Sequence, residues 1–276
     1  MLALKDFRAV TISVSDLDRS VAFYRDLLGF PVLARAAAAA VLDAGGGQVL
    51  QLISAPAPRA GGWLPDDLQI GLRHVGFKCR DTDATTARLK AADVPFTLDP
   101  LDATGGVRIA FFKDPDGTLL EVVQGALEYH VAGPAANALP PVVPPGEALI
   151  FDHIAITVSD LEGALAFYRD RLGFPIIGQL FFNDARGFTI TYLQAGSAVL
   201  ELFSFASPTL PNPHDPDPAA LGLKHVVFEV EDPSAAAAGL ELESAGVPAG
   251  LDNAVLVTGF DGTAFALAGA LVSAER

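Results

Sequence analysis

The pattern of apolar and polar residues switches between a two-residue and a helical period along the chain. Residues 10–14 alternate apolar with small or polar side chains, which predicts a half-buried strand. Apolar residues then recur every three or four positions over 21–28, which predicts a helix capped by Ser15 or Asp16. Leu-Gly-Phe-Pro ends it, because glycine can adopt the left-handed conformation and proline cannot continue a helix. Three strand-like runs follow, the last at 48–54, so the unit is predicted to be βαβββ.

A second unit of the same kind follows a loop rich in proline and glycine at 56–67. Residues 73–81 are predicted to form a strand, and 84–96 contain a helix that ends before a proline. Residues 107–124 are predicted to form two strands joined by the turn Asp-Pro-Asp-Gly. The C-terminal half of the chain repeats this plan, so four βαβββ modules are expected.

The repeat is direct: residues 151–175 match residues 7–31 in a constant register of 144 positions, and His153 falls opposite Ala9. A proline-rich segment between the two halves is typical of a semi-rigid linker. With 276 residues, two domains are expected. The predicted organisation is an N-terminal domain at 1–130, a linker at 131–149 and a C-terminal domain at 150–276.

Composition narrows the classes of partner. Eighteen basic and 33 acidic residues give a formal charge of −15, which disfavours nucleic acid and anionic membrane surfaces. The single cysteine, Cys79, excludes an intrachain disulfide and fits a reducing compartment. Neither a signal peptide nor a long apolar run is recognisable, so a cytoplasmic location is predicted.

The chain resembles the vicinal oxygen chelate superfamily in three features. These are the repeated segment whose second copy reads HIAITVSDLEGALAFYRDRLGF, the later His-Val-x-Phe strands, and the sequence DPDGTLLE. This superfamily includes glyoxalases, bleomycin-resistance proteins and extradiol dioxygenases. The resemblance implies an α+β fold in which four βαβββ modules form two glyoxalase-like, cup-shaped sheet domains. It is specific for the fold and weak for the reaction, because the superfamily hosts several chemistries.

In the resembling enzymes, the first and last strands of each module supply metal ligands. The corresponding first-strand positions are Ala9, His74, His153 and His225, and the last-strand positions are Gln51, Glu121, Glu201 and Ala266. The second and third modules therefore keep a histidine and a glutamate each, whereas the first and fourth modules each carry an alanine. A lone histidine on an apolar strand is usually a core residue, but a glutamate between apolar neighbours is costly to bury without a cation.

The pairing of modules decides which of these ligands meet. Sequence-adjacent pairing leaves each cup one ligand short, with the alternative set His153, Glu201 and His225 in the C-terminal cup. Crossed pairing unites His74, Glu121, His153 and Glu201 in one cup and leaves the other cup with Gln51 and His225. Crossed pairing is the more economical arrangement, because it places both alanines in one abandoned site.

Imidazole and carboxylate ligands suit a divalent metal such as Zn, Ni, Mn or Fe. The resemblance then implies a metal-dependent lyase or isomerase of the glyoxalase type, with Glu121 and Glu201 as catalytic residues that move a proton. The expected partner is a small oxygenated, partly apolar substrate, bound by a monomer or homodimer. The alternatives are an extradiol-type dioxygenase and a non-catalytic binder of an antibiotic or metabolite.

Overall fold

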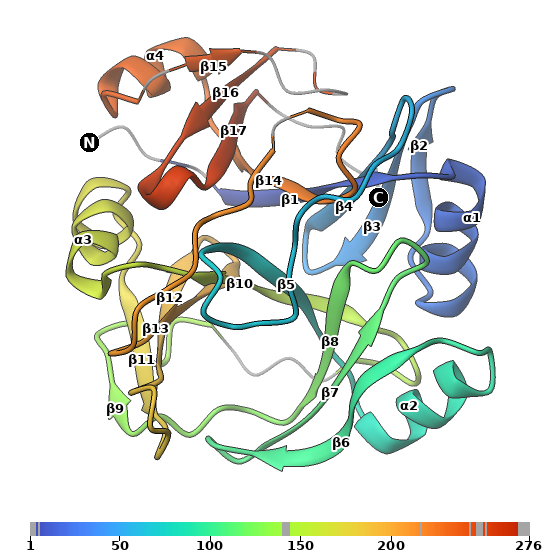
Figure 1. The fold of residues 1–276 in the computed structure, drawn as a ribbon, viewed down its shortest axis with the longest axis horizontal. Helices are drawn as coiled ribbons and strands as arrows, with labels where there is room; N and C mark the ends of the chain where they lie inside the picture. Colours follow the sequence, from blue (N-terminus) through green and yellow to red (C-terminus); the bar gives the residue numbers. More distant parts are fainter. Residues whose placement is uncertain are drawn as a thin grey trace.

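The computed structural model describes residues 4, 6–139, 144–215, 217–242, 244–246, 251 and 253–269. Its helices are α1 (Leu17–Ala22), α2 (Thr82–Lys90), α3 (Leu161–Leu165) and α4 (Pro233–Gly239), with the π-helical turns η1 (Phe23–Leu27) and η2 (Ala166–Arg171) and the 3-10 turn η3 (Phe260–Gly262). Helices α1 and α2 lie at one side of the molecule, and α3 and α4 lie at the opposite side (Figure 1).

Two large sheets contain the strands of the described residues. The first sheet has the order β15-β16-β17-β14-β1-β4-β3-β2. Its strands are β1 (Asp6–Val14), β2 (Val32–Arg35), β3 (Ala39–Gly45), β4 (Gln48–Ser54), β14 (Gly222–Glu229), β15 (Ser244–Gly246), β16 (Ala254–Thr258) and β17 (Ala264–Ala268).

The second sheet has the order β6-β7-β8-β5-β10-β13-β12-β11-β9. Its strands are β5 (Gly71–Lys78), β6 (Phe96–Ala103), β7 (Val107–Lys113), β8 (Leu119–Gln124), β9 (Val131–Ala132), β10 (Ile150–Thr157), β11 (Ile176–Phe181), β12 (Thr189–Ala195) and β13 (Ala198–Ser204).

These strand orders confirm the crossed pairing. The first module joins the fourth through antiparallel β1 and β14, and the second module joins the third through antiparallel β5 and β10. Each sheet therefore takes strands from both halves of the sequence. The domain boundaries at 1–130 and 150–276 stay a prediction about the repeat, and the sheets divide the chain differently.

The local sequence signals explain how each module begins. The side chain of Asp16 accepts a hydrogen bond from the backbone N–H of Arg19, which caps α1, and Asp160 caps α3 in the same way. After α1 the helix widens into η1 and ends at Gly29, which has a φ of 84°. Polar capping and a glycine stop thus position the first helix of each half against its sheet.

Two parts of the chain differ in detail from the expected elements. The helix of the fourth module is short: α4 ends at Gly239, and residues 244–246 form β15. Within the predicted linker, Val131 and Ala132 form β9, which pairs with β11 at the edge of the second sheet. The beginning of the linker therefore extends the sheet.

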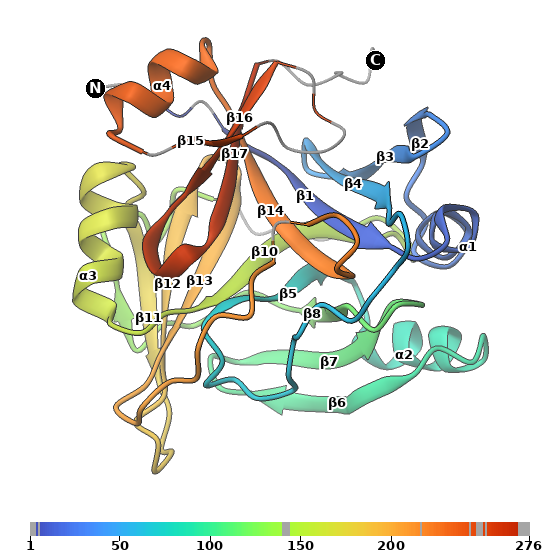
Figure 2. The ribbon, with the colours of Figure 1, turned by 45° about the horizontal axis from the view of Figure 1, so that its top comes forward.

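The two sheets pack on each other through aromatic side chains of their central strands. The rings of Phe7 and Phe151 lie 5.1 Å apart, and Phe228 and Phe77 pack against them from β14 and β5. Beside this core, the loops that precede β5 and β14 run next to each other, joined by bridges at Arg59 and Gln69 (Figure 2). The corresponding segments of the two halves thus meet in the middle of the molecule.

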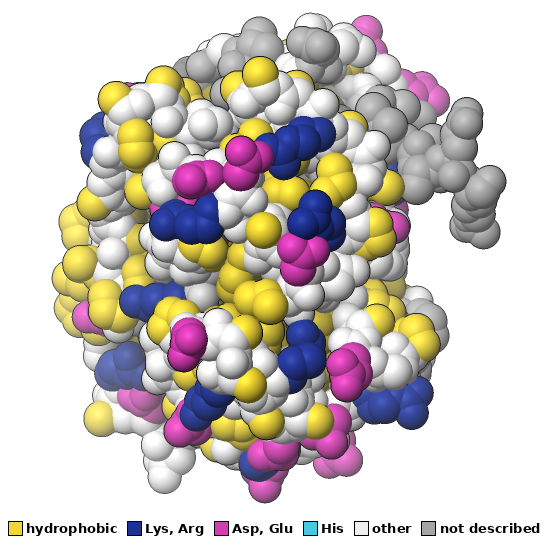
Figure 3. All heavy atoms as spheres, turned by 90° about the vertical axis from the view of Figure 1, so that its right-hand side faces the viewer, with side chains coloured by type: hydrophobic (Ala, Val, Ile, Leu, Met, Phe, Trp, Pro, Cys, Tyr) yellow, Lys and Arg dark blue, Asp and Glu magenta, His cyan; other side chains and the backbone are white. Residues whose placement is uncertain are grey.

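The outer surface carries charges of both signs. Figure 3 shows lysine and arginine side chains interspersed with aspartate and glutamate over one face of the molecule. Within the described part of the chain, we find no helix that combines the length and the apolar character needed to cross a membrane.

Candidate metal centre

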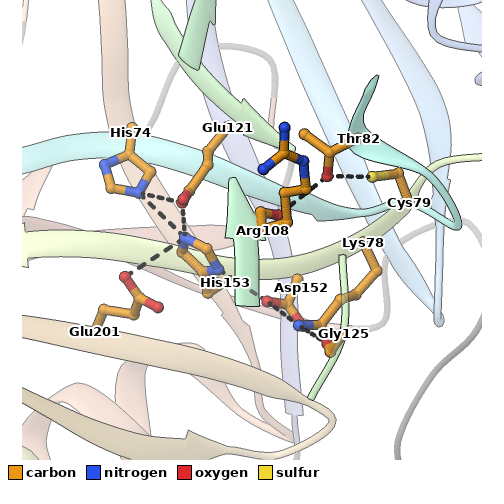
Figure 4. Close-up of polar contacts among 10 residues, drawn as sticks. All are labelled: His74, Lys78, Cys79, Thr82, Arg108, Glu121, Gly125, Asp152, His153 and Glu201. Atoms are coloured by element: carbon orange, nitrogen blue, oxygen red, sulfur yellow. Dashed lines mark hydrogen bonds and ion pairs between the residues drawn. The ribbon is translucent and has the colours of Figure 1, made fainter. Parts of the chain in front are cut away.

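Four neighbouring strands of the second sheet, β8, β5, β10 and β13, bring the four predicted ligands together. They carry Glu121, His74, His153 and Glu201, respectively, and all four side chains are at least nine-tenths buried. Their side chains point toward one another (Figure 4), and one ligand atom from each lies within 4.8 Å of the others. Residues separated by up to 127 positions in sequence thus share one small volume.

The spacing of the donor atoms fits a metal ion. His153 Nε2 lies 3.0 Å from Glu121 Oε2, 3.1 Å from His74 Nε2 and 3.5 Å from Glu201 Oε2. Metal–ligand bonds of about 2.0–2.2 Å place adjacent ligands on one ion about 3 Å apart. Two imidazoles and two carboxylates at this spacing form a cluster that could hold a divalent metal.

A glycine makes room for one of these ligands. In the register of β5 and β10, His153 lies opposite Gly76. A Cβ atom at position 76 would lie 2.0–2.4 Å from three atoms of the His153 ring, a separation that real structures do not show. Gly76 is a site residue that our sequence analysis missed, and its signal was the difference between His-Val-Gly-Phe in β5 and His-Val-Val-Phe in β14.

Asp152 fixes the orientation of His153, and sequence analysis missed it as well. Its Oδ2 lies 2.9 Å from His153 Nδ1, on the side of the ring away from the cluster. Lys78 Nζ lies 3.7 Å from the same carboxylate oxygen and donates a hydrogen bond to the carbonyl of Gly125 (Figure 4). Carboxylate partners of this kind set the tautomer and direction of metal-binding histidines.

The buried ionisable groups shift one another's pKa values. Burial favours a neutral Glu121, but hydrogen bonds from His153 and His74 outweigh it and lower the pKa of Glu121 to about 2. Burial, opposed by His153 and reinforced by Glu121 and Asp152, raises the pKa of Glu201 to about 7. Burial disfavours a charged His153, yet Glu201, Asp152 and Glu121 together raise its pKa above the usual value. The cluster thus joins two carboxylates and two imidazoles whose protonation states depend on one another.

The cluster opens into a cavity of about 470 Å³. Aliphatic and aromatic side chains line it together, and the aromatic ones are Phe111, Phe182, Phe188, Phe203, Tyr192 and Trp63. Phe111 packs edge-on against the ring of His74, with centroids 4.9 Å apart. The volume and the apolar walls around a few convergent polar groups are typical of a small-molecule site.

The corresponding place in the first sheet is apolar. Ala9 and Ala266 occupy the positions of His153 and Glu121, and Val227 occupies that of Gly76. These three residues are fully buried in one cluster with Val49 and Leu251. Alanine and valine offer no donor atom, so this cup cannot reproduce the ligand set.

His225 and Gln51 both lie in the first sheet. His225 is buried on β14 opposite Thr11, and the hydroxyl of Thr11 donates to Gln51 Oε1 at 2.9 Å. Burial lowers the pKa of His225 to about 3. Because His225 and His153 belong to different sheets, the alternative set His153, Glu201 and His225 is not assembled.

The only cysteine is buried at the end of β5 and away from the cluster. Cys79 Sγ lies 3.4 Å from Thr82 Oγ1, and burial raises the pKa of the thiol (Figure 4). A protonated, enclosed thiol is a poor nucleophile.

The fold and the cluster together are those of a vicinal-oxygen-chelate-type protein. The model of the Glyoxalase/Bleomycin resistance protein/Dioxygenase superfamily matches residues 7–122 and 150–252, so the chain belongs to this superfamily.

Curated relatives carry different names. The chain is 35% identical over 130 residues to the uncharacterized protein YaeR of Escherichia coli, covering 45% of this chain and 99% of that protein. It is 27% identical over 211 residues to a catechol-2,3-dioxygenase of Bacillus subtilis, covering 67% of this chain and 69% of that protein. It is 23% identical over 185 residues to lactoylglutathione lyase GLX1 of Arabidopsis thaliana, covering 63% of this chain and 56% of that protein.

Solved structures show the same fold. Glyoxalase I from Zea mays aligns with a TM-score of 0.70 at 20% identity, covering 96% of this chain and 92% of that chain. A dioxygenase described as putative from Bacillus subtilis aligns with a TM-score of 0.66 at 14% identity, covering 98% and 86%. At these identities the likeness establishes the architecture and leaves the reaction to the site.

Proposed function

We propose that this chain is a metal-dependent lyase or isomerase that acts on a small oxygenated, partly apolar substrate in the cup of the second sheet. The observation that supports this most strongly is the convergence of two buried histidines and two buried glutamates at the base of an aromatic cavity. Such a set is costly to bury without a cation, because two carboxylates and Asp152 share one region.

The four ligands would hold the ion: His74, Glu121, His153 and Glu201. A bound divalent ion supplies Lewis-acid stabilisation of negative charge on substrate oxygens. Asp152 keeps Nε2 of His153 directed at the cluster by accepting a hydrogen bond from Nδ1–H. The aromatic walls bind the apolar part of the substrate and exclude water.

Glu201 is the carboxylate that we assign to proton transfer. Glu121 Oε2 lies within 3.1 Å of both histidines, whereas Glu201 Oε2 lies 3.5 Å from His153, the longest of these separations. The more loosely held oxygen is the one that can move toward a substrate C–H and carry its proton between neighbouring carbon atoms. Glu121 serves chiefly as a ligand.

Two other functions were open from the sequence. A dioxygenase is favoured by the catechol-2,3-dioxygenase relative, but four protein ligands leave fewer positions for oxygen and substrate. A metal-free binding protein has no use for two buried glutamates beside two histidines. The metal's identity, the location of the protein in the cell and its oligomeric state stay predictions.

Elemental analysis and turnover test the proposal together. Protein purified without chelators should contain one divalent metal per chain and should convert the glutathione hemithioacetal of methylglyoxal, or another 2-hydroxycarbonyl compound, without consuming oxygen. Glu201→Gln should lower kcat by about 10²–10⁴-fold while metal is retained, since general-base catalysis contributes about that much. Glu121→Gln should lose the metal itself.

Three outcomes would overturn parts of this proposal. A metal-free preparation that still binds small molecules would support the binding protein. Oxygen consumption with a catechol in the presence of Fe²⁺ would support the dioxygenase. Unchanged turnover in Glu201→Gln would remove that residue from proton transfer.

A further inference from the structure

A second cavity, of about 400 Å³, lies where the segments leading into β5 and β14 meet. The same positions of the two strands contribute to it: Leu72 and Arg73 from β5, and Leu223 and Lys224 from β14. It shares a wall of Trp63, Arg73 and Leu119 with the metal-centre cavity, and none of the four candidate ligands lines it. It therefore adjoins the metal-centre cavity and lies between corresponding strands of the two halves, without reaching the candidate ligands.

Three cationic side chains line this cavity, and none forms an ion pair with a described carboxylate. Arg73 is 2% exposed and donates only to uncharged oxygens, Gln69 Oε1 at 3.1 Å and the carbonyl of Leu64 at 2.7 Å. Its buried Nε has no hydrogen-bond partner among the described residues. Asp67 and Asp66 offset part of the guanidinium charge through space, but no described carboxylate accepts a hydrogen bond from it.

Lys224 and Lys113 are the other two cations. Lys224 is 4% exposed and donates to the backbone carbonyls of Asp215 and Asp217, at 3.0 and 3.1 Å. Lys113 is half-buried, and its Nζ lies 5.9 Å from the centroid of the Trp63 ring. The carboxylates of Asp215 and Asp217 offset part of the Lys224 charge through space, but neither is hydrogen-bonded to it, and burial penalises a charge that is only partly compensated.

The acidic residues of the lining have other partners. Asp116 accepts a hydrogen bond from the Ser15 hydroxyl and pairs with Arg19 at 2.6 Å. Asp215 pairs with Arg59 at 2.6 Å. Arg19 and Arg59 lie outside the lining, so the cavity itself has an excess of positive charge in a chain whose formal charge is −15.

We propose that this cavity, the interface cavity, binds a small organic oxyanion, with a carboxylate or phosphate group held by Arg73, Lys113 and Lys224. Planar guanidinium groups bind such oxygens in a fork, and the lysines add charge. The volume lies within the range of small-molecule pockets and exceeds that of a lone phosphate, which favours an organic molecule with an anionic end. This proposal does not depend on the metal centre or on its reaction.

The chain provides its own reporter. Trp63 is the only tryptophan, and its ring stacks on Arg73 with Cζ 4.8 Å from the ring centroid. Titration of the full-length protein with succinate and with inorganic phosphate, at constant ionic strength set by KCl, should give a saturable change in tryptophan fluorescence. A tighter response to one titrant identifies the preferred anionic group. Chelator treatment should leave this response unchanged.

Variants make the test specific. Lys224→Met and Lys113→Met should each weaken binding at least tenfold, with fluorescence and circular dichroism confirming the native fold. Lys90→Met, at an exposed lysine paired with Asp99, is the matched control for removal of one positive charge and should leave binding unchanged. An absent or non-saturable response, or an equal loss in Lys90→Met, would overturn the proposal. Lys113 is half-buried, so its variant tests the idea even where Lys224→Met fails to fold.

Discussion

The two cups of this protein have the same backbone plan and opposite interiors. In the second sheet, a histidine at position 153 lies over a glycine at position 76. In the first sheet, an alanine at position 9 lies opposite a valine at position 227. The large and small partners have exchanged strands, so the volume that an imidazole fills in one cup is filled by an apolar side chain in the other.

The neighbouring charges differ in the same coordinated way. Asp152 lies 3.7 Å from Lys78 beside the candidate metal centre, whereas Arg8 Nε lies 3.2 Å from Glu229 Oε2 at the corresponding place of the first sheet. Both sheets contain this ion pair, but its two charges are exchanged between the strands. On β1 the residue before Ala9 is Arg8, so no carboxylate stands next to the position that corresponds to His153. The two cups therefore differ beside the candidate ligand positions as well as at them.

The largest expected contrast is between His74 and His225, which hold the same position in β5 and β14. His74→Ala removes a ligand and should lower metal affinity by more than about 100-fold, since even outer contacts are worth about 10–100-fold. His225→Ala should leave metal content unchanged. Elemental analysis of the two purified variants checks this, and metal loss in both would mean that the cups do not differ as described.

A smaller effect on metal binding is expected from exchanging Gly76 and Val227, which lie opposite the histidine position in the two sheets. Gly76→Val would place side-chain atoms where the His153 ring lies. The ring should be displaced and the bound metal lost, while the protein still folds. The mirror variant, Val227→Gly, should keep the metal and lose about 2–4 kcal/mol of unfolding free energy through a cavity and a flexible strand residue. Metal content and urea denaturation measure both. Full metal binding by Gly76→Val would contradict the packing role of Gly76.

The smallest effect concerns stability in acid. Because burial lowers the pKa of His225 to about 3, the unfolded chain takes up a proton below its ordinary pKa of about 6.5 while the folded chain does not. The stabilisation is complete above pH 6.5 and falls as the pH decreases toward 3, by about 2 kcal/mol at pH 5. In the presence of a chelator, His225→Leu should show that much less loss of unfolding free energy between pH 7 and pH 5. Equal losses in urea denaturation would show that His225 titrates normally.

The module plan and the four candidate ligands that the fold brings together could be predicted from sequence because both are periodic or repeated. The constant offset of 144 residues aligns His153 with Ala9 and so shows that only one copy has the histidine. Glu121 and Glu201 stand out because they are acidic residues within apolar strands. We predicted the crossed pairing because it places both alanines in one cup and gives the other cup all four candidate ligands. The strand orders agree with that choice.

Gly76 and Asp152 could not be found in the same way. Their roles depend on which residue lies opposite which across β5 and β10, and irregularities at Asp152 and at Arg73 shift that register. A one-residue change in pairing would turn different side chains toward the cluster. The cationic interface cavity also escaped sequence analysis, because its residues come from β5, β14 and loops that meet only in the folded chain.

The crossed arrangement has a consequence for how the two cups could come to differ. If a chain with only two modules paired with an identical copy, each cup would contain one module of each kind, and symmetry would force any substitution into both cups at once. Covalent joining of the two halves removes that constraint. A single polypeptide can keep one reactive compartment while the other is free to become pure scaffold.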